Sequence, residues 1–169
     1  MSTHLQIRSS GVSVVVLRGE GSRTETLLLR RAGKIFTGAW CQVAGGIEEE
    51  ETAWETAVRE LREETELIPT ELHSAGICEQ FYDLRLDGIY IAPVFVVFVD
   101  AHAVVTLNHE HSEYKWVILE KVDEHLATPN QREMFAHVRR HFVERKPTEW
   151  TQIDFKNRRA TKKTLKPPT

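Results

Sequence analysis

The sequence predicts an α/β (α+β) fold, an α/β/α sandwich around a mixed β-sheet, built as one domain. Runs of β-branched and aliphatic residues recur along the chain, and segments with helical periodicity lie between and after them. The length of 169 residues favours a single domain and is sufficient to bury a core. Strands mixed with a few helices in one compact unit are typical of layered folds.

The first strands come early in the chain. Residues 12–17 and 26–30 are β-branched or aliphatic runs, and the polar turn at 18–23 between them contains glycine, so they are expected to pair. Residues 31–40 have little periodicity and are expected to form a loop. A short strand is expected at 41–44, running into two consecutive glycines.

A helix is predicted at residues 53–65. Thr52 and Glu55 have the T-x-x-E spacing of a capping box, which starts the helix, and Pro69 follows its end. At about 100° per residue, one side of this helix carries the residues expected to pack on the sheet, namely Trp54, Val58, Leu61 and Thr65.

The second half of the chain predicts further strands and helices. Residues 77–82 and 89–99 are expected to form a hairpin, and 114–118 a short strand. Residues 121–126 and 131–143 have helical patterns. A last edge strand is expected at residues 151–155.

Composition and charge exclude several classes of protein. With 41% hydrophobic and 28% charged residues, the chain has the composition of a soluble globular protein, and no apolar run is long enough to span a bilayer. Two cysteines without CxxC spacing, and no secretory signal pattern, indicate a cytoplasmic protein with reduced thiols. The net charge of −3 argues against nucleic-acid binding as the main role. We divide the chain into a domain at 1–145 and a basic extension at 146–169.

Three glutamates of the predicted helix share one face, because Glu60, Glu63 and Glu64 are spaced i, i+3 and i+4. Like charges at this spacing repel, and a divalent cation offsets that repulsion; oxygen ligands favour Mg²⁺ or Mn²⁺. The alternative is a solvated acidic face stabilised by Arg59 and Arg62.

The pattern around these glutamates resembles the Nudix box, G-x5-E-x7-R-E-U-x-E-E-x-G-U. The matching residues are Gly45, Glu51, Arg59, Glu60, Leu61, Glu63, Glu64 and Leu67. The resemblance implies the Nudix fold and metal-dependent hydrolysis of a nucleoside diphosphate linked to a further group.

Each matched position has an implied role. Glu60 and Glu64 resemble the principal metal ligands, with Glu63 assisting. Arg59 and Glu51 resemble an ion pair that holds the loop and helix together. Gly45 allows the loop backbone to approach the metal and the phosphates closely.

The chain departs from the family at two positions. Glu66 stands where the motif has a glycine that ends the helix, so a left-handed backbone at this position would cost free energy. Glu50 also stands where many family members have glycine. Glu66 lies outside the carboxylate set, so we expect it to change stability or loop path and not to abolish catalysis. Glu50 raises the local negative charge and is expected to strengthen the demand for metal.

A second motif lies at residues 110–116, where E-H-x-x-Y-K-W resembles dihydroneopterin triphosphate and dATP-type pyrophosphohydrolases of the same family. In those enzymes this glutamate is a metal-binding or basic carboxylate. Glu110 is therefore the predicted general base, ahead of Glu113. His109 and His111 are interpreted as surface residues of the loop.

Four further residues are candidates for substrate binding. Arg30 and Arg31 follow an apolar strand and have the bidentate geometry that suits phosphate, the alternative being a solvated strand end. Trp40 and Phe36 are candidates for stacking on a purine or pterin ring, the alternative being a structural role.

These features predict a Mg²⁺-dependent pyrophosphohydrolase (Mn²⁺ being the other candidate ion) of a nucleotide or pterin triphosphate. The rival functions are hydrolysis of nucleotide sugars or dinucleoside polyphosphates, and a non-catalytic nucleotide sensor. No membrane partner is expected. A homodimer is left open, because enzymes of this family are often dimers.

Overall fold

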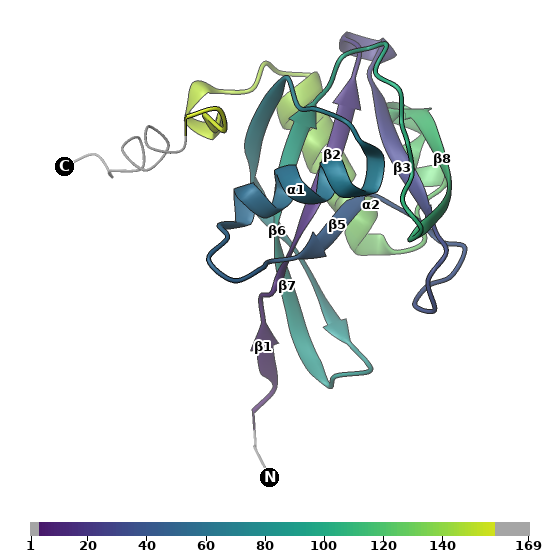
Figure 1. Cartoon of the computed structure of the whole chain (residues 1–169), viewed down its shortest axis with the longest axis vertical. Coiled ribbons are helices and arrows are strands. Elements are labelled where there is room, and N and C mark those ends of the chain that lie inside the picture. The colour runs from purple at the N-terminus through teal and green to yellow at the C-terminus, as the bar shows by residue number, and fades with distance from the viewer. Residues whose placement is uncertain (1–3, 158–169) are drawn as a thin grey trace, which may run out of the picture.

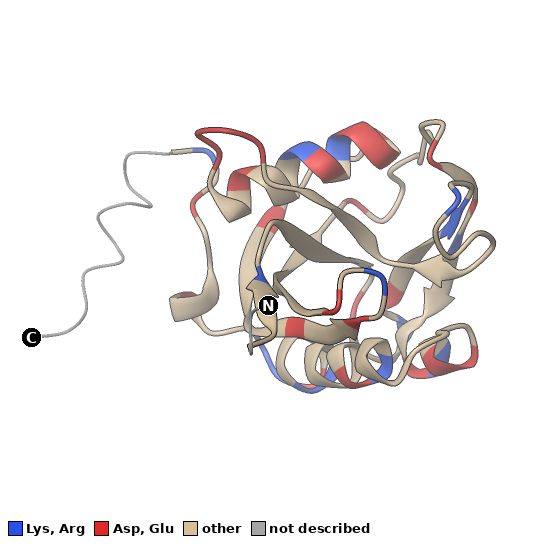
Figure 2. Cartoon of the chain, turned by 90° about the horizontal axis from the view of Figure 1, so that it is seen from below, with Lys and Arg blue, Asp and Glu red and all other residues tan. Residues whose placement is uncertain are grey.

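The computed structural model describes residues 4–157 and has three layers, with a mixed β-sheet between two helices. Helix α1 (Ala53–Thr65) covers one face and α2 (Pro129–Val138) the other (Figures 1 and 2). The predicted α/β/α sandwich is confirmed. No helix within residues 4–157 is long and apolar enough to cross a membrane.

The sheet has eight strands, in the order β1-β7-β2-β3-β4, with β5 beside β2, β6 beside β7 and β8 beside β3. Strand β7 runs parallel to β1 and β2, and the other pairs are antiparallel. The strands are β1 (Gln6–Arg8), β2 (Gly11–Arg18), β3 (Glu25–Arg31), β4 (Trp40–Cys41), β5 (Val43–Gly46), β6 (Glu71–Asp83), β7 (Gly88–Phe98) and β8 (His111–Ile118).

Strand β2 is apolar on both faces because both faces are covered. Val14 and Val16 face α1, where Leu61 packs, whereas Val15 and Leu17 face α2. All four side chains are fully buried. A continuous apolar run, without alternation, is the expected pattern for a strand inside a sandwich.

Strands β2 and β3 pair at one end only, through Leu17↔Thr26 and Arg18↔Glu25. Towards the other end they diverge, and residues 40–46 bridge the gap: β4 pairs with β3 and β5 pairs with β2. Gln42 lies between these two short strands. The sheet is therefore split at this end, and the split positions the candidate site.

Helix α1 begins and ends where the sequence predicts. The capping box is formed, with the backbone N–H of Thr52 donating to the Glu55 carboxylate at 2.9 Å. At the other end Glu66 adopts φ 57°, and its N–H donates to the Arg62 carbonyl at 2.9 Å. Glu50 also has a positive φ, of 65°. Both glutamates thus occupy left-handed conformations at positions where the family has glycine.

The predicted strands are present with different bounds, except the last one. The strand expected at 41–44 is two strands, because the chain crosses from β3 to β2 at Gln42. The short β1 was not predicted, since only its pairing with β7 makes it a strand. The edge strand expected at 151–155 is wrong: residues Glu149–Thr151 form a 3₁₀ turn, and one bridge joins His73 to Gln152.

The helices after β8 also differ from expectation. Residues 121–126 lie largely within a 3₁₀ helix (Leu119–Glu124), and the helix expected at 131–143 is α2 followed by a π-helical turn (Arg139–Val143). Ile153 and Phe155 of the C-terminal extension pack against the core on the α1 side. The basic residues that lie outside the described residues are Arg158, Arg159, Lys162, Lys163 and Lys166.

Candidate active site

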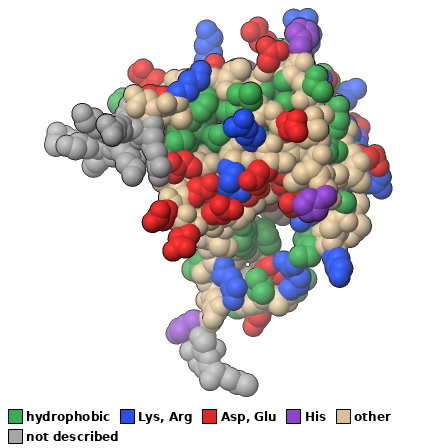
Figure 3. Space-filling view, viewed as in Figure 1, with side chains coloured by type: hydrophobic (Ala, Val, Ile, Leu, Met, Phe, Trp, Pro, Cys, Tyr) green, Lys and Arg blue, Asp and Glu red, His purple; other side chains and the backbone are tan. Residues whose placement is uncertain are grey.

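The carboxylates of α1 lie over β5 at the split end of the sheet. A Cβ at Gly45 would come within 1.9 Å of the carboxyl carbon of Glu60, so only glycine leaves room for that side chain. The backbone N–H of Ala44 donates to the Glu64 carboxylate. Strand β5 and helix α1 therefore meet through two carboxylates, and acidic side chains gather on this face of the molecule (Figure 3).

Arg59 holds the loop before α1 to the helix. Its Nε and Nη2 donate to the two carboxylate oxygens of Glu51, both at 2.9 Å, and Nη2 also donates to the Gly46 carbonyl at 2.7 Å. The hydrogen bonds from Arg59 lower the pKa of Glu51 to about 2, and Thr56 adds a further one. The ion pair expected between Arg59 and Glu51 is present.

Arg59 also contacts two of the three helix glutamates. Its Nη1 lies 2.8 Å from Glu60 and 3.0 Å from the largely exposed Glu63. Within residues 4–157, no group of three His, Cys, Asp or Glu side chains is arranged to hold a metal ion. Glu60 and Glu63 are turned towards Arg59, and a cation binding them would have to compete with that guanidinium.

Glu64 is the most unusual of the carboxylates. Its side chain is 2% exposed, and its Oε2 has no hydrogen-bond partner among the described residues. Burial raises the pKa of Glu64 to about 9, and the charges of Glu60 and Glu110 contribute to the rise. Burial also raises the pKa of Glu60. A carboxylate that is buried and unpaired is costly unless a cation joins it.

The wall opposite α1 is formed by β3 and β8. The charge of Arg31 lowers the pKa of Glu64, whereas Glu110 raises it, so both side chains act on the helix carboxylates. The two candidate arginines differ in their contacts, because Arg30 forms an ion pair with Glu113. Residues on successive positions of a strand point to opposite faces. Arg30 and its partner Glu113 therefore lie on the opposite face from Arg31, whereas Glu110, in the turn before β8, is linked to the site by the effect of its charge on Glu60 and Glu64.

His111 is buried, which corrects the prediction that it lies on the loop surface; His109 is exposed as expected. Burial lowers the pKa of His111. The charge of Glu110 opposes this effect, and the charge of Arg31 adds to it. The imidazole is therefore predominantly neutral near pH 7.

The two aromatic candidates differ in their surroundings. Trp40 is half-buried, packs against the core on the α2 side, and has the Lys115 ammonium 3.9 Å from its ring centroid. Phe36 is 66% exposed in the loop between β3 and β4, with φ 51°. One face of Trp40 is thus occupied, whereas Phe36 is open to solvent.

A buried polar network on the α2 side was missed by the sequence reasoning. The Glu79 carboxylate accepts hydrogen bonds from Ser13, from Gln42 at 3.1 Å and from Asn130 at 2.9 Å. Gln42 in turn accepts one from Gln131 at 3.2 Å. These residues come from four distant segments, so no local pattern identifies them. Only Asn130 and Gln131 carry a sequence signal, because the segment Asn130-Gln131-Arg132 also weakly resembles the dihydroneopterin triphosphate and dATP-type pyrophosphohydrolases.

This network borders a groove of about 430 Å³ between β6 and α2. Its lining includes Glu79 and Asn130 from the network, and Glu133, His137 and Arg140 from the exposed side of the helix and its π-turn. Gln42 belongs to this network and lies at the split of the sheet, next to β5, over which the α1 carboxylates lie. The α1 carboxylates are suited to a charged group of a ligand, and the groove is suited to a group that forms hydrogen bonds.

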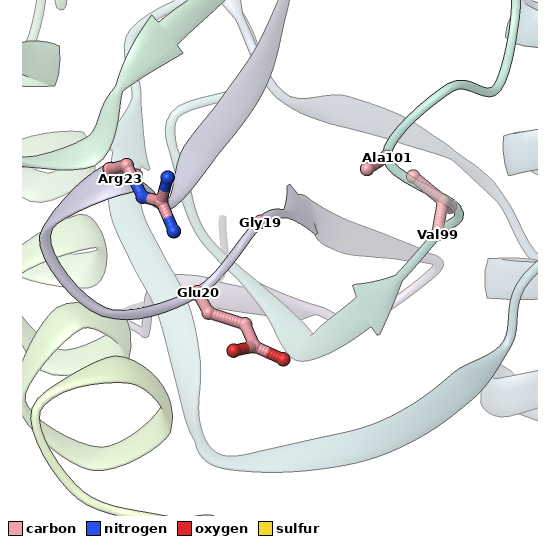
Figure 4. A pocket seen from close by; sticks show the side chains of 5 residues that line it. All are labelled: Gly19, Glu20, Arg23, Val99 and Ala101. Atoms are coloured by element: carbon pink, nitrogen blue, oxygen red, sulfur yellow. The ribbon is translucent and has the colours of Figure 1, made fainter.

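A second cavity, of about 490 Å³, lies at the opposite end of β2 from Gly45 (Figure 4). It is lined by Gly19, Glu20, Arg23, Val99 and Ala101. With a single carboxylate and a single guanidinium, it lacks the grouped acidic side chains found at α1. We therefore assign the candidate active site to the split end of the sheet.

Comparison with known proteins identifies the family of this chain and its fold. A family model described as the NUDIX domain matches residues 8–138. Nucleoside triphosphatase NudI of Klebsiella pneumoniae (strain 342) is 31% identical over 90 residues, which cover 49% of this chain and 64% of that protein. Putative nudix hydrolase 1 of Caenorhabditis elegans is 37% identical over 71 residues, or 38% of this chain and 20% of that one. The chain thus matches less than two thirds of the length of either relative.

Solved structures show the same fold. The MutT protein of Methanosarcina mazei Go1 superposes with a TM-score of 0.66 at 29% identity, covering 82% of this chain and 97% of that one. A C. elegans Ap4A hydrolase binary complex gives a TM-score of 0.64 at 20% identity, covering 75% and 92%. At that identity the second similarity concerns the fold alone.

Proposed function

Because the chain belongs to the Nudix family, we propose that it is a divalent-metal-dependent hydrolase that cleaves a phosphoanhydride bond in a nucleoside triphosphate or a related triphosphate. The observation that carries the proposal is the buried carboxylate of Glu64, whose Oε2 has no hydrogen-bond partner among the described residues and whose pKa responds to the charges of Glu60, Glu110 and Arg31. Carboxylates with raised pKa values, beside a guanidinium, suit a ligand that brings both a cation and phosphate oxygens.

The oxygen donors present suit a hard divalent cation, although they are not gathered around one point in the described structure. Glu64 Oε2 lacks a hydrogen-bond partner among the described residues, and the missing Cβ of Gly45 leaves room for the Glu60 carboxylate. Glu60 and Glu64 are the proposed ligands, with Glu63 assisting. When bound, Mg²⁺ (or Mn²⁺) neutralises charge on the phosphates and makes a water molecule more acidic.

The chain's own groups would then perform separate tasks. Arg31 would bind a phosphate oxygen, since its charge acts on Glu64 and a guanidinium matches the geometry of phosphate. Glu110 would accept the proton of the attacking water. Its side chain is exposed, and the hydrogen bond that it accepts from Asn108 is long at 3.5 Å. Glu51 and Arg59 would keep the loop and helix in register during these steps.

The groove between β6 and α2 is the proposed site for the part of the substrate that is not phosphate. The amide group of Asn130, which lines the groove and is oriented by Glu79, is suited to hydrogen-bond the edge of a nucleobase or a pterin. The similarity to a nucleoside triphosphatase supports a nucleotide. Phe36 is retained as a stacking candidate, and Trp40 as a residue that supports the groove.

The test is a substrate screen with Mg²⁺, scored separately for phosphate and for pyrophosphate. We expect pyrophosphate release from one or more nucleoside triphosphates or from dihydroneopterin triphosphate, and none after Glu60→Gln or Glu64→Gln. Turnover of only nucleotide sugars or dinucleoside polyphosphates would replace the proposed substrate class. Nucleotide binding without any turnover would instead indicate a sensor.

Two expectations from the sequence stay predictions. A cytoplasmic location could be checked by fractionation of the native host. A homodimer could be checked by analytical ultracentrifugation of the full-length chain.

A further inference from the structure

His111 reaches the carboxylate side of the sheet because of a β-bulge. In the β3–β8 pair, Arg30 is opposite Glu113 and Arg31 is opposite His111, so Ser112 is an extra residue in β8. Without that residue, position 112 would be opposite Arg31 and residue 111 would point to the α2 side. A bulge of this kind redirects one side chain, and such bulges are frequent beside active sites.

The face to which His111 points follows from the neighbouring pairs. Leu27 and Leu29 belong to the core cluster beneath α1, and Leu28 belongs to the cluster beneath α2. Arg31 continues the odd-numbered series and therefore lies on the α1 side. His111, as its partner across the bulge, lies on the same side, where Glu110 and Arg31 are the charges that act on it.

The imidazole of His111 is buried but incompletely hydrogen-bonded. Its side chain is 8% exposed, and its Nδ1 has no partner among the described residues. The other buried histidine, His73, is 3% exposed and has both ring nitrogens paired, with Thr151 at 3.1 Å and with Glu71 at 3.2 Å. A histidine that served the core alone would be expected to resemble His73, because an unpaired buried donor costs free energy.

The neighbouring residue Glu110 has a carboxylate that is able to accept a hydrogen bond from Nδ1 of His111. It is exposed, its only side-chain hydrogen bond in the described structure is the 3.5 Å contact with Asn108, and its charge acts on His111 as well as on Glu60 and Glu64. We propose that His111 is a positioning residue whose Nδ1–H donates to the Glu110 carboxylate and holds it in the site.

This inference rests on the proposed function, in which Glu110 takes the proton of the attacking water. A carboxylate on an exposed loop samples many rotamers, and a hydrogen bond from a rigid, buried ring restricts them. A neutral imidazole is suited to this task, because it donates a hydrogen bond without adding a charge that would compete with the cation.

A double-mutant cycle tests whether His111 acts through Glu110. His111→Leu removes the donor at similar volume and should lower kcat about tenfold with little change in KM, as for other groups that orient a catalytic residue. In the Glu110→Gln background, the same substitution should change kcat by less than about twofold. An equal loss in both backgrounds would overturn the proposal, because the two residues would then act independently.

Two further variants separate positioning from a structural effect. His111→Asn keeps an N–H donor near the position of Nδ1 and should retain kcat within about threefold of the original protein. His109→Leu changes an exposed histidine two residues away in the same loop and should have no effect. If His111→Asn loses as much activity as His111→Leu, a hydrogen bond from this position is not what matters.

A measurement without turnover separates this inference from the proposed function. The NMR signals of the ring nitrogens are recorded for the protein labelled with ¹⁵N-histidine, in a titration with Mg²⁺ alone. Among the signals of the eight histidines, those of His111 are assigned by their loss in His111→Asn. We expect the Nδ1–H tautomer, with a signal that Glu110→Gln shifts and Glu113→Gln does not. An Nε2–H tautomer, or an equal response to both substitutions, refutes the proposal even if the protein hydrolyses triphosphates. A lack of turnover with the expected signals would contradict only the proposed function.

Discussion

Replacing Glu64 by glutamine should make the metal-free protein more stable while abolishing its response to Mg²⁺. The substitution keeps the shape of the side chain and removes its charge. The amide oxygen of the new glutamine can still accept the N–H of Ala44, the hydrogen bond that Glu64 makes now. What is lost is a buried ionisable carboxyl group whose Oε2 has no hydrogen-bond partner in the described structure.

The magnitude follows from the pKa. In the folded state the pKa of Glu64 is raised from 4.5 to about 9, so the folded protein binds this proton more tightly than the unfolded chain. The contribution of Glu64 to the free energy of unfolding is therefore most favourable below pH 4.5 and falls as the pH rises towards 9. At about 1.4 kcal/mol per pH unit, keeping Glu64 protonated in the folded state at pH 7.5, where the unfolded chain would be ionised, costs up to about 4 kcal/mol.

The glutamine variant escapes most of this cost. Its new N–H₂ group also needs a partner, at a cost of about 1–3 kcal/mol if it finds none. We therefore expect a net gain in the free energy of unfolding of about 1–3 kcal/mol at pH 7.5, and at pH 5 a net change between about zero and a loss of about 2 kcal/mol.

The assay is urea unfolding in EDTA at both pH values, followed by tryptophan fluorescence, and repeated with Mg²⁺. Mg²⁺ should stabilise the original protein at pH 7.5 and leave the variant unchanged, since a ligand of the folded state raises its stability. Glu63→Gln is the matched control, because that side chain is largely exposed and should gain little. If Glu64→Gln is less stable than the original protein in EDTA at pH 7.5, the reasoning about this buried carboxylate is refuted.

Three other sets of substitutions probe the same region. Glu66→Gly and Glu50→Gly should each raise the free energy of unfolding by about 0.5–1 kcal/mol, because glycine adopts their positive φ without strain; a lower melting temperature in both would contradict this. Glu51→Gln should cost about 1–2 kcal/mol at pH 7 and nothing near pH 2, because its folded pKa is depressed to about 2 and its stabilisation is lost as the pH falls from 4.5; denaturant titrations across this range measure it. Gly45→Ala should leave the circular dichroism spectrum unchanged but lower kcat at least tenfold, because its Cβ would displace the Glu60 carboxylate; near-normal activity would contradict that contact.

Much of the site could be predicted because its signals are local. The capping box at Thr52 and the spacing of Glu60, Glu63 and Glu64 depend only on helix geometry, and α1 has the predicted bounds. The Nudix pattern implied the contact between Arg59 and Glu51 across eight residues, and the structure contains it. The strained Glu66 was identified for the same reason, since a helix end has its own local requirements.

Other features depend on which strands become neighbours. The network around Glu79 joins side chains from distant segments, and no periodicity in one segment indicates its partners in another. The position of His111 depends on one extra residue in β8, which changes the face that the side chain occupies without changing the local sequence pattern. The difference between Arg30 and Arg31 has the same origin.

The sequence by itself determined the family, the helix and the identity of the carboxylates, because these depend on interactions within a few residues. Only the tertiary structure decided that Glu64 is buried, with an Oε2 that has no hydrogen-bond partner in the described structure, and that the charge of Glu110 acts on it. It also decided that β2 and β3 separate at the end of the sheet where the site lies. The reason is physical: burial and pairing result from packing segments that are far apart in the chain, and they set the desolvation that raises the pKa of Glu64.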